Sequence, residues 1–307
     1  MSWLTVAVFS YLILAAVYLV DKYLLTGSVT NPKVYTFYVG ILWILVLLLV
    51  PFVDFYVPEM SQIVLSLSAG AVFIWGLFWF YKALHLFEAS RVVPAVGSLT
   101  PLFAFLLIYV FTSGRETLSL YGAAAFVLLI LGNILINLRK EKFINFESFK
   151  FSVLTAFFFS LAFVLAKYVY LAQPFWNGFI WRSMGGFLMA VCFLFIFPEI
   201  RKELFLTGKS LLPGGSKKTS AIFVSNQLAG AGSAILQNWA IFLAPLALVP
   251  LIHALNGTQY VFLFIFSVFL SLKFPRILKE EVSRDVILQK VIAIILIGLG
   301  LVLLSVQ

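Results

Sequence analysis

Long apolar stretches alternate with short polar connections along the whole chain. Ten of these stretches are long enough to cross a bilayer as helices, which takes about 20 residues each. We predict them at 3–20, 34–53, 62–84, 92–112, 119–137, 150–171, 175–197, 219–243, 246–271 and 287–305. The pattern therefore predicts an all-α polytopic membrane protein with ten transmembrane helices.

The two halves of the chain carry related patterns on either side of a charged linker at 139–142. Pro94 and Pro101 are predicted to break the fourth stretch, and Pro250 and Gly257 occupy similar places in the ninth. Because each half has five stretches, the second half enters the membrane inverted relative to the first, as in several transporter folds. We expect two inverted five-helix repeats, which comprise residues 1–141 and 142–307.

The composition excludes a water-soluble protein. Hydrophobic residues make up 63% of the 307 positions and charged residues 11%, whereas soluble domains average about 25% charged residues. The net charge of +9 lies mainly in short connections between the stretches, where basic residues set topology. We therefore expect a lipid bilayer and no nucleic acid as a partner, and a multi-pass protein of a bacterial or archaeal plasma membrane.

The clearest internal match joins residues 81–136 to residues 238–304. Each segment has a helix of small residues, a polar turn with Glu and Ser, and a Gly-rich last helix. The two turns are Glu116-Thr117-Leu118-Ser119 and Glu280-Glu281-Val282-Ser283. On these segments the chain resembles the EamA-type transporters of the drug/metabolite transporter superfamily. The resemblance implies a ten-helix basket with a central cavity, which moves small metabolites such as amino acids by alternating access, often outward.

Two arguments about sidedness disagree. Of the 21 Lys and Arg residues, 18 fall in or beside the odd-numbered connections, which favours termini outside the cell. The resemblance instead implies that both termini are cytoplasmic. A further departure from strict repetition is Gly257, which stands where the first copy has Pro101.

The fourth and ninth stretches hold the first candidate substrate-binding residues. Polar side chains inside a membrane are costly and usually face a cavity or each other. By helical spacing His253, Asn256 and Tyr260 share one stripe of the ninth stretch, and Ser98 and Thr100 are their counterparts in the fourth. Interrupted helices at matching places in both halves point to a binding site. Interhelical hydrogen bonding is the alternative explanation for the same residues.

Three more residues are candidates for the cavity wall: Gln237 in the eighth stretch, Trp79 in the third and Arg182 in the seventh. Arg182 lies deep in an apolar stretch, so it needs a carboxylate, backbone carbonyls or an anionic substrate group. Asp21 and Glu88 are the nearest candidate acids. Packing and gating are alternative roles for Trp79 and Arg182.

These patterns favour a secondary active transporter of small polar or amphipathic metabolites, most simply an exporter, as a monomer or homodimer. His253 can couple transport to protons. No catalytic residues, cofactor or metal site are expected, since His85 and His253 lack ligand spacing and no phosphate-binding loop occurs. The alternatives are a non-transporting accessory subunit of a flippase or assembly complex and a membrane-embedded enzyme that acts on lipid-linked substrates.

Overall fold

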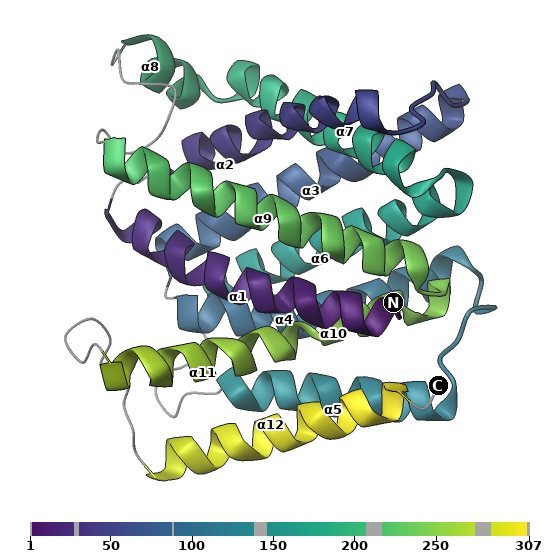
Figure 1. Ribbon diagram of the computed structural model, residues 1–307, viewed down its shortest axis with the longest axis vertical. Coiled ribbons are helices and arrows are strands. Elements are labelled where there is room, and N and C mark those ends of the chain that lie inside the picture. Colours follow the sequence, from purple (N-terminus) through teal and green to yellow (C-terminus); the bar gives the residue numbers. More distant parts are fainter. Residues whose placement is uncertain are drawn as a thin grey trace.

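The computed structural model describes residues 2–27, 31–87, 89–137, 146–206, 217–273 and 284–305, and all regular structure in these ranges is helical. Figure 1 shows the helices stacked as a bundle. They are α1 (Trp3–Gly27), α2 (Pro32–Ile41), η1 (Leu42–Phe52), α3 (Met60–Leu86), α4 (Ala89–Phe111), α5 (Leu120–Asn137), α6 (Phe146–Ala172), α7 (Phe175–Ile196), α8 (Pro198–Leu206), α9 (Lys217–Leu243), η2 (Leu246–Leu248), α10 (Val249–Ala254), α11 (Asn256–Lys273) and α12 (Arg284–Ser305).

The chain is an all-α membrane protein. Within the described residues, six helical segments are long and apolar enough to cross a membrane. They are Pro32–Phe52, Met60–Leu86, Phe149–Ala172, Phe175–Ile196, Leu246–Leu263 and Leu288–Ser305. Large apolar side chains also cover the outside of the bundle: Phe195, for example, is 74% exposed. Such a surface requires a lipid environment, since soluble proteins rarely expose large contiguous apolar patches.

The helices pack in pairs that join distant parts of the chain. α3 lies against α6 and α7, α1 against α9, and α5 against α12, and the last two pairs can be followed in Figure 1. Small residues allow the closest of these contacts. A Cβ atom on Gly70 of α3 would collide with the Arg182 carbonyl oxygen of α7, and one on Gly185 would collide with Leu67.

Each predicted stretch overlaps a helical segment, although three details differ from expectation. The second stretch changes from α2 into the 3-10 helix η1 at Leu42. The connection expected after residue 198 begins with the short helix α8. The predicted break in the fourth stretch is wrong, because α4 runs without interruption from Ala89 to Phe111 through both Pro94 and Pro101.

Proline at position 101 removes the backbone donor to the Gly97 carbonyl, four residues earlier in α4. Membrane helices tolerate such losses where neighbouring groups meet the freed backbone groups. Two side-chain hydroxyls bond to other carbonyls of α4 close to Pro101. Next to Pro101, the Thr100 hydroxyl donates to the Val96 carbonyl at 2.7 Å. The Ser160 hydroxyl of α6 lies within donating distance, 2.7 Å, of the Thr100 carbonyl.

Candidate functional site at the divided helix

The ninth stretch is divided where α10 ends at Ala254 and α11 begins at Asn256. A helix end leaves backbone carbonyls without intrahelical donors, and here side chains supply them. The Tyr11 hydroxyl of α1 donates to the Ile252 carbonyl at 2.8 Å. Asn133 of α5 donates to the Ala254 carbonyl at 3.2 Å. Two other helices therefore hold the division in place, one from each side.

Asn256 and Tyr260, which were predicted to share one stripe, both lie against α4. A Cβ atom placed on Gly97 would stand 3.0 Å from Asn256 Nδ2 and 3.2 Å from the Tyr260 hydroxyl oxygen. The absence of a side chain at Gly97 thus lets both polar groups approach the α4 backbone. The next residue, Ser98, is buried, and its hydroxyl oxygen has no hydrogen-bond partner.

His253 lies in the last turn of α10 and is only 3% exposed. Its ring stacks on Phe163 of α6, with 4.0 Å between the centroids and 20° between the planes. The Nε2 atom is buried without a hydrogen-bond partner. More than nine in ten buried polar groups in proteins are paired, so His253 and Ser98 are unusual among the described residues near the divided helix.

Two of the predicted site residues are engaged in bonds within the protein. Thr100 donates to its own helix, as described above. Gln237 of α9 donates through Nε2 to the Tyr11 hydroxyl oxygen at 3.3 Å. Because Tyr11 in turn donates to the divided helix, Gln237 acts on the site through Tyr11.

Arg182 lies on another side of the core. It is 2% exposed, and its guanidinium carbon stands 5.2 Å from the Phe73 ring centroid and 5.7 Å from the Trp43 ring centroid. Its Nε atom is buried without a partner. The acids proposed to pair with it, the Asp21 side chain and Glu88, lie outside the described residues.

Aromatic rings connect Arg182 to the divided helix. Phe73 of α3 contacts Phe163 of α6, with the ring centroids 5.8 Å apart. Phe163 is the ring on which His253 stacks. Arg182, Phe73, Phe163 and His253 therefore form one continuous series of contacts, which we call the aromatic series.

Trp79 is separate from this series. Its ring stacks on Phe151 at 5.6 Å between centroids, and Lys82 Nζ lies 5.0 Å from the centroid of each of these two rings. The structure therefore places Trp79 in the packing between α3 and the first turns of α6. These contacts do not join Trp79 to the divided helix.

Sequence reasoning missed Tyr11, Asn133 and Phe163, which build the surroundings of the divided helix. Tyr11 and Asn133 carry one available signal, a polar atom inside an apolar stretch, but this signal does not identify the helix that they meet. Phe163 carries no signal, because it is one of 34 phenylalanines in the chain.

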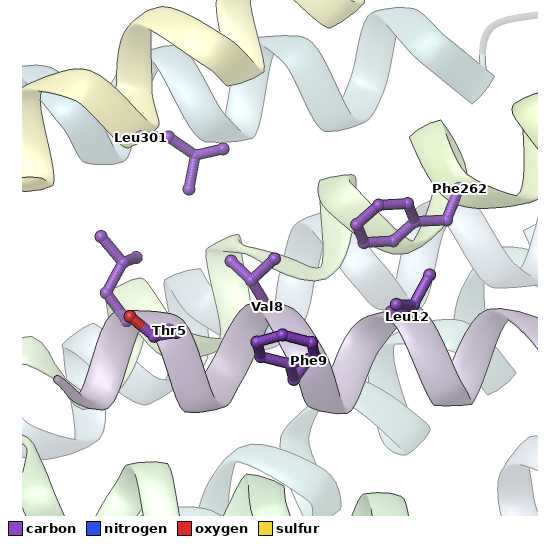
Figure 2. A pocket seen from close by; sticks show the side chains of 7 residues that line it. Thr5, Val8, Phe9, Leu12, Phe262 and Leu301 are labelled. Atoms are coloured by element: carbon purple, nitrogen blue, oxygen red, sulfur yellow. The ribbon is translucent and has the colours of Figure 1, made fainter. Parts of the chain in front are cut away.

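The structure also contains a hollow of about 450 Å³ on an outer flank, away from the predicted site. Figure 2 shows α1, α11 and α12 around it. It is lined by Leu4, Thr5, Val8, Phe9, Leu12, Phe262 and Leu301. All of these but Thr5 are apolar, and Phe9 is half exposed. The hollow therefore lacks the polar groups that would orient a polar metabolite.

No family model matches the chain, and no curated protein matches it either. Among solved structures, 28 chains match. One of them, a crystal structure, aligns over 99% of this chain and 95% of its own chain with a TM-score of 0.65 and 17% sequence identity. This likeness shows a shared fold.

Proposed function

We propose that this chain is a secondary active transporter of small polar or amphipathic metabolites that works by alternating access. The observation that carries the proposal is the divided helix α10–α11 with the unpaired Nε2 of His253 and the unpaired hydroxyl oxygen of Ser98 near it. Divided membrane helices mark substrate sites in transporters, because they expose backbone and polar groups within the membrane. A substrate bound there would supply the missing hydrogen bonds.

The proposal includes ten spans arranged as two inverted repeats, residues 1–141 and 142–307. In such a repeat, the first span (α1) corresponds to the sixth (α6), and the third span (α3) to the eighth (α9). The fourth span (α4) corresponds to the ninth, which contains α10 and α11. The packing of α1 on α9 then corresponds to the packing of α6 on α3, and that of α4 on α6 to that of α11 on α1. Three further packed pairs each join a helix to its own counterpart in the other repeat: α5–α12, α4–α10 and α2–α7.

These pairs are what a two-fold axis in the membrane plane would produce, so they support the repeat and, with it, the resemblance to EamA-type transporters. The packing of α3 on α7 departs from this symmetry, because α2 and α9 do not pack on each other to a comparable extent. The divided helix pairs with its own counterpart, α4, where such an axis would cross the bundle. A site on this axis is reached from both sides by equivalent movements of the two halves, which is the requirement for alternating access. We further propose export across a bacterial or archaeal plasma membrane, with the proton as the coupling ion.

Transport by the purified chain in liposomes is the experiment that tests this function. A panel of radiolabelled amino acids, nucleosides, sugars and organic acids is offered to wild type and to two variants. We expect Asn256→Ala to reduce flux of the transported compound about ten-fold, because it removes a polar group at the divided helix. Trp79→Phe is the matched control and should keep wild-type flux, since Trp79 packs elsewhere.

The main alternative, an accessory subunit, predicts a different result. A chain that moves nothing from the panel alone, but restores flux when a second membrane protein is added, would be a subunit and not a transporter. The unpaired buried atoms of His253 and Ser98 favour the transporter, because a purely structural subunit gains nothing from leaving them unbonded.

A further inference from the structure

Arg182 is a buried cation that the described part of the chain does not neutralise. It is 2% exposed, its Nε has no partner, and none of the described acidic side chains is buried. The ion pair of the described residues joins Lys33 to Glu199, at a different place. Because an unpaired charge within a membrane protein is costly, such residues are usually functional.

Lys167 provides an internal comparison. It is nearly as buried, at 4% exposure, yet its Nζ donates to the Phe242 carbonyl of α9 at 3.0 Å. Among the described residues, the fold therefore supplies a backbone acceptor to Lys167 and none to Arg182 Nε. A ligand can be the acceptor for Arg182.

The surroundings of Arg182 are aromatic. Trp43 and Phe73 lie within cation–π distance of the guanidinium. Neither ring can accept a hydrogen bond as a carboxylate or carbonyl does, and Arg182 Nε has no partner among the described residues. Guanidinium edges match carboxylate and phosphate groups through paired hydrogen bonds. The residue types at this place thus suit a negatively charged group attached to an apolar ring.

The aromatic series indicates how a bound molecule would be oriented in the protein. It leads from Arg182 along Phe73 and Phe163 to His253 at the divided helix. A planar apolar body would stack along these rings, with its charged group at Arg182 and its other end near the unpaired Nε2 of His253. One molecule would then form hydrogen bonds with both Arg182 Nε and His253 Nε2.

We infer that the substrate is a small organic anion whose carboxylate or phosphate group is bound by Arg182 and whose planar apolar body lies along Phe73 and Phe163. This inference rests on the proposed transport function, because it names the substrate class of that function. It adds that neutral and cationic analogues of the same shape bind more weakly.

Binding to the purified protein in detergent tests the inference without requiring transport. The probes are benzoate, phenylacetate, indole-3-acetate and phenyl phosphate, each compared with its neutral amide or alcohol. We expect at least one anion to bind about ten-fold or more tightly than its neutral partner. Arg182→Gln should abolish that preference, while Lys167→Met, which removes the other buried cation, should keep it.

Two further variants keep the test decisive if Arg182→Gln does not fold. Arg182→Lys retains the charge but not the planar donor edge, so we expect about ten-fold weaker binding. Binding should also change the tryptophan fluorescence of wild type, and Trp43→Phe should remove most of that change, because Trp43 covers the guanidinium.

The outcomes separate this inference from the function on which it rests. If no anion binds better than its neutral partner, or if Arg182→Gln and Arg182→Lys both keep the preference, the anion site does not exist. Flux of a neutral or cationic metabolite that is unchanged in Arg182→Gln also overturns it and leaves the transporter intact. Anions that bind through Arg182 while liposomes show no flux of any compound would uphold the site and reject the transport function.

Discussion

Buried polar atoms in this protein divide into those that hold helices together and those that have no partner. Tyr170 of α6 donates to Asn238 Oδ1 at 2.9 Å, and Ser233 of α9 donates to the Ser10 carbonyl at 2.9 Å. Each bond of this kind contributes about 0.6 kcal/mol in a membrane. The atoms of Arg182 and His253 that make no such bond are the ones on which the proposals rest.

The ion pair between Lys33 and Glu199 is expected to make the stability of the protein depend on pH. Lys33 Nζ donates to Glu199 at 2.6 Å, and this hydrogen bond holds the pKa of the Glu199 carboxyl below its ordinary value. A carboxyl whose pKa is lower in the folded state stabilises the protein above its unfolded-state pKa of about 4.3. The stabilisation is lost as the pH falls through the lower, folded-state pKa.

We therefore expect Glu199→Gln to destabilise the protein slightly at pH 7 and 5, with the difference disappearing on acidification below about pH 4. Both side chains are partly exposed, so the coupling energy should be about 0.5 kcal/mol. A double-mutant cycle with Lys33→Met, followed by reversible denaturation in detergent, measures it. A coupling that grows on acidification would contradict the assigned sign.

At the scale of helices, the contact between α3 and α7 depends on glycine. A Cβ atom at Gly70 would collide with the Arg182 carbonyl and would stand 2.6 Å from the Gly186 nitrogen. Both neighbours are backbone atoms, which cannot rotate away as a side chain would. The two helices can therefore approach this closely only while position 70 carries no side chain.

We expect Gly70→Ala to lower the free energy of unfolding by about 1–3 kcal/mol, as overpacking does in other cores. Gly232→Ala in α9 is the matched control, because a Cβ atom there meets nothing within 4 Å. Alanine favours a helix over glycine by about 1 kcal/mol, so this control should be neutral or slightly stabilising. Thermal unfolding of the two variants in detergent compares them, and equal losses would show that the close approach is not limiting.

At the scale of the whole molecule, the ten predicted spans would fix which connections share a side of the membrane. The first helix begins and the last helix ends at the same end of the bundle (Figure 1). In a ten-span chain the even-numbered connections lie on that side too, and the odd-numbered ones lie opposite. This arrangement holds whichever side faces the cytoplasm.

Single cysteines test the arrangement in a Cys192→Ser background, since the natural cysteine is exposed. We expect Ser2→Cys, Glu59→Cys and Thr117→Cys to react with a membrane-impermeant thiol reagent from one side, and Lys202→Cys from the other. Any other grouping means that a span has been missed or invented. The side that labels from the cytoplasm also decides between the charge bias and the family resemblance.

The positions of the helices were predictable and their meeting points were not. Each predicted apolar stretch overlaps a helical segment, because length and hydropathy are local properties of the chain, whereas the short helix α8 lies where a connection was expected. Asn256 and Tyr260, which share a stripe by helical spacing, both lie near Gly97 of α4, and their role in substrate binding stays a prediction. The breaks predicted at Pro94 and Pro101 are wrong, because α4 continues through both residues, and membrane helices tolerate internal prolines.

The sequence by itself determined that this is a helical membrane protein, roughly where each helix runs, and which polar residues lie within the membrane. Only the tertiary structure decided which of those residues keep an unbonded atom. Tyr11 meets the Ile252 carbonyl across 241 positions of sequence, and Lys167 meets the Phe242 carbonyl across 75. Such bonds depend on how helices pack across the bundle, so the unpaired state of Arg182 and His253 emerges only once every neighbour is in place.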